Sequence, residues 1–357
     1  MEKFAFIIHP LDVSDVARKF SITRYMPNSV VEKALRFLPP FTTSHITGIK
    51  SIQNKEAEGW FISCPLTAQQ MMTLPQELVL ERIIQAGKVA EKLGAGIVGL
   101  GAFTSVVGDA GVTIANNLNI AVTTGNSYTV ATAIEGTKRA AQLMGHKLSN
   151  SHLVVVGATG SIGQVCSLIM AREVKNLTLV GRNTTALNNL AEKILYQTGL
   201  AAKVTSKIKN VLPTADIIIT VTNSVDTIIK PEDLKSGAVV CDVARPRDVS
   251  KRVAEQREDV LVIEGGVVEV PGNVNFNFNF GFPTGMAYAC MAETMMLALE
   301  GRYENYSLGR QLTVKQVDQI SKIAEKHGFA LAGFRSFEKA ISNEQINVIR
   351  KKALTIA

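Results

Sequence analysis

A strand followed by a glycine-rich turn and a helix is the feature that most constrains the fold of this chain. Leu153–Val156 are four consecutive apolar residues, which is typical of a strand buried in a parallel sheet. Gly157, Gly160 and Gly163 follow at intervals of three, and a helix-compatible run extends over 162–174. In this setting the first glycine permits a tight turn, the second lets the backbone approach a pyrophosphate, and the third lets helix and strand pack closely. The alternative is a purely structural turn between strand and helix.

The end of the next expected strand indicates which dinucleotide fits this turn. An NAD site usually carries Asp or Glu there, whereas this chain has Arg182, whose guanidinium suits a 2′-phosphate. The sequence therefore favours NADPH over NADH, and a solvated arginine at a strand end is the alternative. A later apolar strand also ends in small polar residues, as strands that face a cofactor often do. The expected cofactor residues are Gly157, Thr159, Gly160, Ser161, Ile162, Gly163, Arg182, Asn183 and Thr222.

The pattern of the whole chain predicts an α/β protein. From residue 151 onward, strands and helices alternate regularly, which is typical of a Rossmann-type doubly wound parallel sheet. We expect three regions: an N-terminal α/β substrate domain over 1–150, a Rossmann NADP-binding domain over 151–268, and a mainly helical C-terminal region over 269–357 that carries the candidate nucleophile. The strands expected in the Rossmann domain are 153–156, 177–181, 203–206, 216–222, 238–243 and 260–264.

Composition narrows the classes of partner. The chain has 357 residues and a net charge of +7, so its surface suits an acidic partner, but no long basic run favours nucleic acid. No apolar run approaches the roughly 18 residues of a membrane span. The cysteines at 64, 166, 241 and 290 are far apart and form no CxxC motif. We therefore expect a reduced, cytoplasmic protein without disulfides or structural zinc.

Two expected strands in the first region end in glycine followed by hydroxyl or amide side chains. One is followed by Thr104 and Ser105, and the other by Asn126 and Ser127. In open α/β sheets, ligands bind beyond the carboxyl ends of strands, so these side chains are candidates for contacting substrate or stabilising an oxyanion. The alternative is that Asn126 or Ser127 caps the next helix.

Cys290 lies near the start of an Ala- and Met-rich helix expected over 286–299. A helix N-terminus lowers the pKa of a nearby thiol, although a cysteine in such a helix is usually a packing residue. Cys64 is a second candidate thiol, and Cys166 and Cys241 are expected in the core. None of the five histidines falls in a glycine-rich stretch, so the sequence offers no base for Cys290.

Several segments, in the same order along most of the chain, resemble the long-chain acyl-[acyl-carrier-protein] reductases of cyanobacteria. The resemblance implies NADPH-dependent reduction of a fatty acyl thioester to a fatty aldehyde, with Cys290 as the acylated nucleophile. The N-terminal residues and the stretch 273–280 depart from the family pattern, and the tail after about residue 330 extends beyond it. The resemblance therefore leaves the length of the acyl chain and the identity of its carrier open. The matching segments are 101–105, 123–127, 155–163, 264–269, 288–293 and 305–310.

The resemblance also implies the partners. The substrate is expected on an acyl carrier protein or on CoA, with peripheral membrane contact for aldehyde release and no nucleic acid. Apolar walls for the acyl chain are expected from Phe103, Met286, Met291 and Met295, although methionine at helical spacing is more often core.

Weaker similarities keep other functions open. The segment 242–249 resembles glutamyl-tRNA reductases, which also reduce a cysteine thioester with NADPH. A substrate domain followed by a dinucleotide domain also fits shikimate dehydrogenases. One alternative is therefore a shikimate-dehydrogenase-like NADP-dependent oxidoreductase with no covalent intermediate. The other is a non-catalytic NADP-binding protein.

Overall fold

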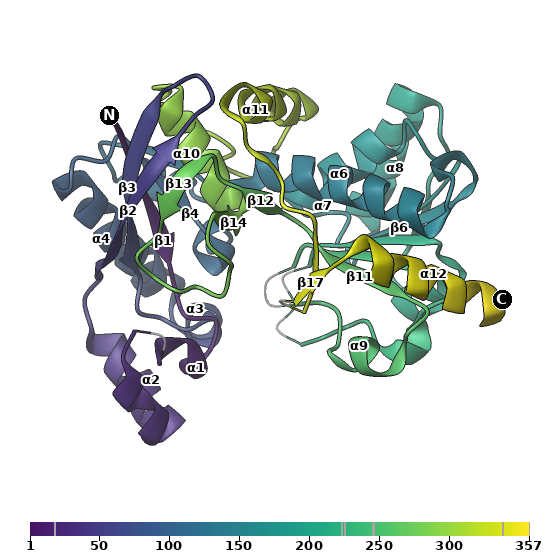
Figure 1. The fold of residues 1–357 in the computed structure, drawn as a ribbon, viewed down its shortest axis with the longest axis horizontal. Coiled ribbons are helices and arrows are strands. Elements are labelled where there is room, and N and C mark those ends of the chain that lie inside the picture. Colours follow the sequence, from purple (N-terminus) through teal and green to yellow (C-terminus); the bar gives the residue numbers. More distant parts are fainter. Residues whose placement is uncertain (18, 223, 225, 245–246, 338, 357) are drawn as a thin grey trace. The chain divides into compact units, whose positions relative to one another are not determined.

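The computed structural model describes every residue except 18, 223, 225, 245, 246, 338 and 357. The chain forms two compact units, each built on a six-stranded sheet (Figure 1). Unit 1 comprises Met1–Tyr128, Val268–Gln311 and Gln319–Ala330. Unit 2 comprises Thr129–Val267, Leu312–Asp318 and Leu331–Ala357.

The sheet of unit 1 is mixed, with strand order β13-β2-β3-β1-β4-β5. Strands β3, β1, β4 and β5 are parallel, whereas β2 runs antiparallel to both β3 and β13. The strands are β1 (Glu2–Ile8), β2 (Phe41–Lys50), β3 (Glu56–Ser63), β4 (Ile97–Leu100), β5 (Ala121–Thr123) and β13 (Gly272–Asn275).

Helices cover both faces of this sheet because apolar residues occupy both sides of its strands. Ala5 and Ile7 pack into one core with α4 (Gln76–Lys92). On the other face, α10 (Ala289–Leu299) approaches so closely that a Cβ added to Gly99 would lie 2.1 Å from Thr294 Oγ1. Only glycine leaves room for the helix at this point of β4.

A small helical arm follows β1. It contains α1 (Val13–Val16) and α2 (Asn28–Phe37), which share a separate cluster of four apolar residues. The other short helices of unit 1 are α3 (Ala68–Thr73) and α5 (Val112–Ala115).

The sheet of unit 2 is entirely parallel, in the order β11-β10-β9-β6-β7-β8. Counted along the chain, this is the order 3-2-1-4-5-6 of a doubly wound dinucleotide-binding fold. The predicted α/β class and parallel Rossmann sheet are confirmed. The strands are β6 (His152–Val156), β7 (Asn176–Val180), β8 (Lys203–Thr205), β9 (Ile217–Thr220), β10 (Val239–Asp242) and β11 (Leu261–Glu264).

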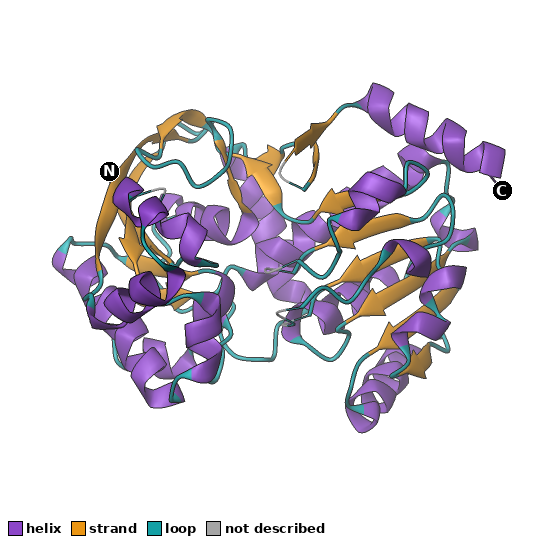
Figure 2. Cartoon of the chain, turned by 90° about the horizontal axis from the view of Figure 1, so that it is seen from below, coloured by secondary structure: helices purple, strands orange, loops and turns teal. Residues whose placement is uncertain are grey.

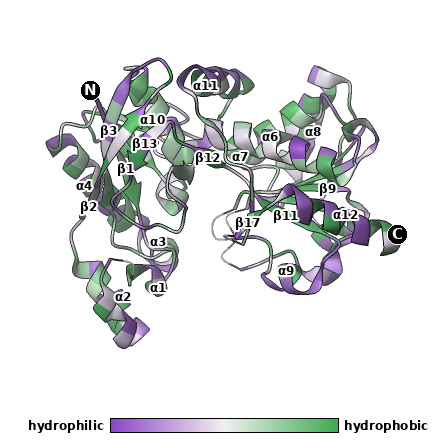
Figure 3. Cartoon of the chain, in the orientation of Figure 1, coloured by the Kyte–Doolittle hydropathy of each residue, from purple (hydrophilic) through white to green (hydrophobic). Residues whose placement is uncertain are grey.

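Both faces of this sheet are buried, and its strands consist mainly of apolar residues (Figures 2 and 3). Leu153 and Val155 belong to a core shared with α6, α7 and α8. Val154 and Val156 belong to the core on the opposite face, to which α9 contributes Val253. The helices are α6 (Asn126–Met144), α7 (Ser161–Met170), α8 (Thr184–Thr198) and α9 (Arg252–Gln256).

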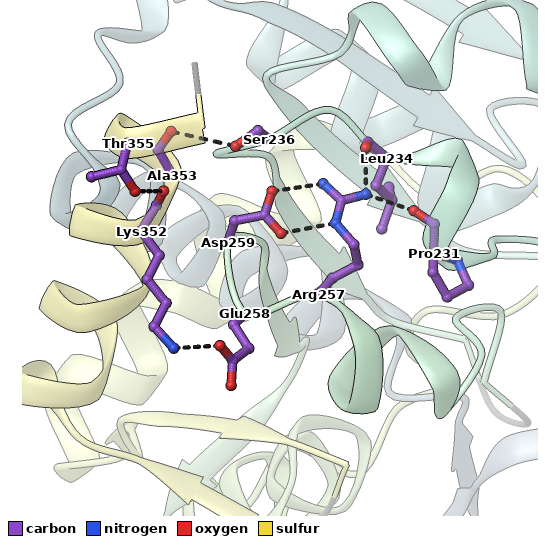
Figure 4. Close-up of polar contacts among 9 residues, drawn as sticks. All are labelled: Pro231, Leu234, Ser236, Arg257, Glu258, Asp259, Lys352, Ala353 and Thr355. Carbon is purple, nitrogen blue, oxygen red and sulfur yellow. Dashed lines mark hydrogen bonds and ion pairs between the residues drawn. The ribbon is translucent and has the colours of Figure 1, made fainter.

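The C-terminal helix α12 (Asn343–Ile356) belongs to unit 2 and packs beside the loop before β11 (Figure 4). Lys352 pairs with Glu258, and Ser236 Oγ donates to the Ala353 carbonyl at 3.4 Å. The neighbouring Arg257 forms two hydrogen bonds of 2.8 Å with the Asp259 carboxylate. The remaining elements are α11 (Val314–His327), β12 (Val267–Glu269), β14 (Met286–Tyr288), β15 (Ala330–Leu331), β16 (Phe334–Ser336) and β17 (Lys339–Ile341).

The compact units do not follow the three expected ranges 1–150, 151–268 and 269–357. Most of α6 packs into the core of unit 2 although it precedes residue 151, because its apolar face contacts the Rossmann strands. Helix α10 belongs to unit 1 because it packs on β1 and β4. No described helix is both long enough and apolar enough to cross a membrane.

Candidate active site

The glycine-rich turn of unit 2 lies where the strand order reverses. Gly157 follows β6 with φ +81°, and a Cβ added to it would lie 2.5 Å from the carbonyl oxygen of Val221, just after β9. A Cβ on Gly163 would lie 2.3 Å from the Gly157 carbonyl oxygen, so α7 packs directly on the turn. The strands that follow β6 in the chain are added on one side of it, and those that follow β9 are added on the other side. Ligands of open α/β sheets bind at such a point of reversal.

The N-terminus of α7 faces this turn. Gly160 is the N-cap residue, and no side chain caps the helix. The N–H groups of Ser161, Ile162 and Gly163 occupy the first turn, where no intrahelical acceptor exists, and they suit a phosphate. Thr159 precedes them, with its Oγ1 3.4 Å from the position of a Cβ on Gly181 at the end of β7.

The other expected cofactor residues have structural partners. Arg182 is exposed after β7, and the Asn183 side chain accepts from the Ala186 N–H at 3.0 Å and so caps α8. The Thr222 hydroxyl donates to Asp248 at 2.5 Å. The fully buried Asp248 also accepts from Thr220, so it orients the end of β9. Asp248 is not among the cofactor residues predicted from the sequence, although it lies in the segment 242–249. Residues 245 and 246 of that segment are outside the described residues.

Cys290 is the second residue of α10 in unit 1. It is the one cysteine of the four that is partly exposed, since Cys64, Cys166 and Cys241 are buried. The backbone of Gly125, which has φ +73°, touches it: an added Cβ would lie 2.3 Å from both Cα and Cβ of Cys290. The structure therefore places the end of β5 directly against the candidate nucleophile.

A buried carboxylate lies one helical turn after Cys290. Glu293 is fully buried and accepts hydrogen bonds from Thr123 Oγ1 at 2.5 Å, Ser127 Oγ at 2.8 Å and the Tyr128 N–H at 2.8 Å. Burial raises the pKa of Glu293, while these hydrogen bonds oppose the shift. We had not predicted this residue, although a single acidic residue in an Ala- and Met-rich helix was a usable signal.

The polar side chains in the loops beyond β4 and β5 differ in their hydrogen-bond partners. Thr104 Oγ1 and Ser105 Oγ each donate at 2.7 Å to carbonyls of their own loop. The Ser127 hydroxyl lies in the Glu293 network, 2.5 Å from Ser307 Oγ. Asn126 is partly exposed, and its N–H donates to no other described residue. Of the four residues, Asn126 has a donor available to a ligand.

Cys64 and Cys166 are not suited to act as nucleophiles, and His9, beside these loops, is not suited to act as a base. Burial raises the pKa of Cys64 to about 12 and also raises the pKa of Cys166. His9 accepts from the Phe103 N–H at 3.2 Å and contacts the Pro10 carbonyl at 3.0 Å. Desolvation lowers the pKa of His9 to about 4, so the ring is neutral and both nitrogens are used by the backbone.

A serine, a histidine and a glutamate also lie in a row elsewhere in unit 1. His327 Nδ1 is 2.8 Å from Ser51 Oγ, and its Nε2 is 2.5 Å from Glu300. Ser51 is 2% exposed and accepts from the Gln53 N–H in a turn, so its hydroxyl is closed to substrate. No group of three or more His, Cys, Asp or Glu residues in the described part of the chain suits a metal ion.

The family comparison agrees with the geometry of unit 2. Residues 138–264 match the shikimate / quinate 5-dehydrogenase family. Unit 2 carries an NAD(P)-binding domain. Among solved structures, quinate dehydrogenase from Corynebacterium glutamicum in complex with NAD covers 73% of this chain and 87% of its own, at 15% identity and TM-score 0.37.

Two relatives extend over most of the chain. A long-chain acyl-[acyl-carrier-protein] reductase of Synechococcus elongatus is 28% identical, covering 88% of this chain and 94% of its own length. "Aminotransferase PigE" of Serratia sp. is 29% identical over 96% of this chain, which spans only 41% of that protein. A glutamyl-tRNA reductase of Methanococcus maripaludis is 32% identical over 30% of this chain. The chain is thus a distant relative of the acyl-[acyl-carrier-protein] and glutamyl-tRNA reductases.

Proposed function

We propose that this chain reduces a long-chain fatty acyl thioester to a fatty aldehyde through an acyl-Cys290 intermediate. The observation that carries the proposal is the position of Cys290, a partly exposed thiol in the first turn of α10 held against the polar turn after β5. The relationship to an acyl-[acyl-carrier-protein] reductase along 88% of the chain supports it.

The proposed reaction balances in two steps. The Cys290 thiolate attacks the acyl carbonyl carbon, and the bond from that carbon to the carrier sulfur breaks, so the carrier leaves as a thiolate that takes a proton from solvent. NADPH, which the glycine turn of unit 2 would hold, would supply the hydride that reduces the acyl carbon. The resulting thiohemiacetal oxyanion expels Cys290 as thiolate and gives the aldehyde.

The start of α6 suits the developing oxyanion. Gly125 contacts Cys290, and the Asn126 N–H at the helix N-terminus is available as a donor. A fixed donor and the positive end of a helix dipole both stabilise negative charge that appears during the reaction. We therefore retain Asn126 as the oxyanion donor among the four loop residues predicted from sequence.

A second cation beside Arg182 supports NADPH as the cofactor. Gly181 donates to the Thr205 carbonyl at 3.2 Å, so the ends of β7 and β8 are adjacent. Lys207 follows β8 and is exposed, as Arg182 is after β7. Two cations at one sheet edge suit the doubly charged 2′-phosphate of NADPH.

An aromatic cluster next to α10 suits the acyl chain. Tyr288 precedes Cys290 by two residues and packs edge-on against Phe282 at 4.5 Å between ring centroids. Contacts continue from Phe282 to Phe280 at 5.5 Å and from Phe280 to Phe61 at 5.3 Å. By contrast, Phe103, Met291 and Met295 are buried and Met286 is half-buried. We assign the acyl chain to the partly exposed rings of Tyr288, Phe282 and Phe280, whereas Phe61 is fully buried.

The surface of unit 1 suggests how an apolar product leaves. Large apolar side chains are concentrated in the arm of residues 20–37, where Tyr25 is 89% and Phe37 85% exposed. The same stretch holds three basic residues and one acidic residue. An apolar and basic surface favours contact with an anionic membrane. The acyl donor, either acyl carrier protein or acyl-CoA, is expected to be acidic.

The proposal is tested by measuring aldehyde. Purified protein is incubated with palmitoyl-CoA or a loaded acyl carrier protein and NADPH, and the product is extracted and identified. We expect hexadecanal in amounts equal to the NADPH consumed, and none from Cys290→Ser. Turnover of a ketone or 3-keto acid that survives Cys290→Ser would instead support the shikimate-dehydrogenase type. Nucleotide binding without turnover would support a non-catalytic protein.

A further inference from the structure

A buried side chain on the helix of Cys290 holds the turn that touches this cysteine. We propose that Glu293 is a positioning residue for Cys290, whose carboxylate clamps the turn of residues 124–126 against the start of α10. The inference rests on the proposed function for its chemical meaning, because it concerns the reactivity of the proposed nucleophile.

The partners of Glu293 lie on both sides of the turn. Thr123 precedes the turn, whereas Ser127 and Tyr128 follow it, and all three donate to the same carboxylate. The turn therefore cannot move away from α10 without breaking one of these bonds. Breaking one would leave a fully buried polar group unsatisfied, which is unfavourable because the group cannot bond to water instead.

Ser307 holds the same turn from a third segment of the chain. Its carbonyl accepts from Thr124 Oγ1 at 2.5 Å, and its hydroxyl lies 2.5 Å from that of Ser127. Ser307 has φ +53°, a left-handed conformation that is unfavourable for a residue with a Cβ. Surrounding contacts must maintain such a conformation, and here they are the contacts to the turn.

The clamped turn has two consequences for Cys290. Gly125 presses on the Cα and Cβ of the cysteine, which limits the directions that the thiol can take. Asn126, the next residue, has its N–H at the start of α6, so the clamp also fixes the position of this donor. Displacing a reacting group by about 1 Å can reduce a rate about 100-fold, so a small movement of this turn is sufficient to affect reactivity.

Positioning can be separated from charge by two substitutions. Glu293→Gln removes the charge but keeps the length, so its oxygen can still accept from Ser127 and Tyr128, while its amide donates to Thr123 Oγ1. Glu293→Asp keeps the charge but is shorter by one methylene group and cannot reach both sides of the turn. If Glu293 positions the turn, Gln is the better substitute. If its charge acts on the thiol, Asp is the better substitute.

The experiment measures the rate at which iodoacetamide alkylates Cys290, followed by peptide mass spectrometry between pH 6 and 9. Alkylation needs neither an acyl donor nor NADPH, and the other three cysteines are buried. The matched controls are Glu300→Gln and Glu300→Asp. Glu300 follows α10 at its other end and joins it to His327 and Lys326, away from the turn. Ser127→Ala provides a milder break of the clamp should Glu293→Asp fail to fold.

We expect Glu293→Gln to react within about threefold of wild type, with an unchanged pH midpoint. Glu293→Asp should differ from wild type at least about tenfold, and Ser127→Ala about threefold to tenfold. Both Glu300 variants should match wild type. Equal rates in all variants would overturn the inference, and so would Glu293→Asp resembling wild type while Glu293→Gln does not. Because no acyl donor is used, these outcomes are distinct from failure of the proposed thioester chemistry.

Discussion

The candidate nucleophile is defined by close backbone contacts more than by polar side chains around it. Gly125 touches Cys290, and Gly99 in β4 leaves room for Thr294, so two glycines let α10 pack directly against β4 and the turn after β5. Glycine at these places follows from the space available. Sequence reasoning identified Cys290 through the family resemblance, but it could not show that residues 125 and 290, which are far apart in the chain, are in contact.

Replacing Gly125 tests this contact. Gly125→Ala places a Cβ 2.3 Å from the Cα of Cys290, whereas Gly199→Ala has the same left-handed backbone, φ +75°, and no atom within 4 Å. Both variants lose about 1 kcal/mol from the backbone conformation. Gly125→Ala should lose about 1–3 kcal/mol more from the steric clash. Denaturant unfolding measures the difference, and equal stabilities would show that the contact is not close.

The proposed preference for NADPH rests on Arg182 and Lys207. If Arg182 binds the 2′-phosphate as proposed, Arg182→Ala removes a charge-assisted hydrogen bond, which contributes about 1.5–3 kcal/mol. The Kd for NADPH should rise about 10- to 100-fold, and the Kd for NADH should change less than about twofold. Titration calorimetry with both nucleotides checks this. A similar loss for both nucleotides would place Arg182 away from the 2′-position.

His9 gives the fold a dependence on pH. Its pKa is lowered by burial to about 4, and an unfolded histidine titrates near 6.5. The unfolded chain therefore binds the proton first, so stability is complete above about pH 6.5 and falls as the pH drops toward 4. The half-buried ring should contribute about 2 kcal/mol over this range. His9→Gln, which does not titrate, should reduce the difference between unfolding free energies at pH 7 and pH 4.5. An unchanged difference would exclude His9 as the cause.

At the scale of elements, the length of an apolar run and the contacts of its neighbours explain which helices and strands could be predicted from the sequence. The strands of unit 2 were predicted to within one or two residues because long apolar runs separated by helices are specific to parallel sheets. The expected helix over 286–299 instead begins at Ala289, since Met286–Tyr288 pairs as a strand. Alternating Asn and Phe residues after β13 form a loop whose aromatic rings pack together, a contact that no local pattern could predict.

The arm of residues 20–37 should bind anionic membranes. We expect co-sedimentation with vesicles of equal phosphatidylcholine and phosphatidylglycerol, and little with phosphatidylcholine alone. Ile22→Ser combined with Phe37→Ser should weaken binding at least about tenfold, because both side chains are largely exposed. Tyr196→Ser is the matched control, since Tyr196 is 93% exposed in α8. A larger oligomer in solution that these two substitutions disrupt would show that a second copy covers the arm instead.

At the scale of the whole molecule, the two units divide the proposed work. Unit 2 has the strand order and the glycine turn of a dinucleotide-binding domain, and unit 1 has the thiol with its clamped turn. Composition and periodicity predicted the class of unit 2 well because its contacts join successive elements. They predicted unit 1 less well, since β13 pairs with β2, and α10 packs on β1, more than 200 residues earlier in the chain. Such distant pairings leave no periodic signal in the sequence.

The most direct test of the proposed chemistry is the intact mass of the protein after incubation with palmitoyl-CoA or loaded acyl carrier protein, without NADPH. We predict a gain of one acyl group in wild type and none in Cys290→Ser, with discharge of the adduct as aldehyde when NADPH is added. An adduct that persists in Cys290→Ser, or the absence of any adduct with either donor, would contradict the account.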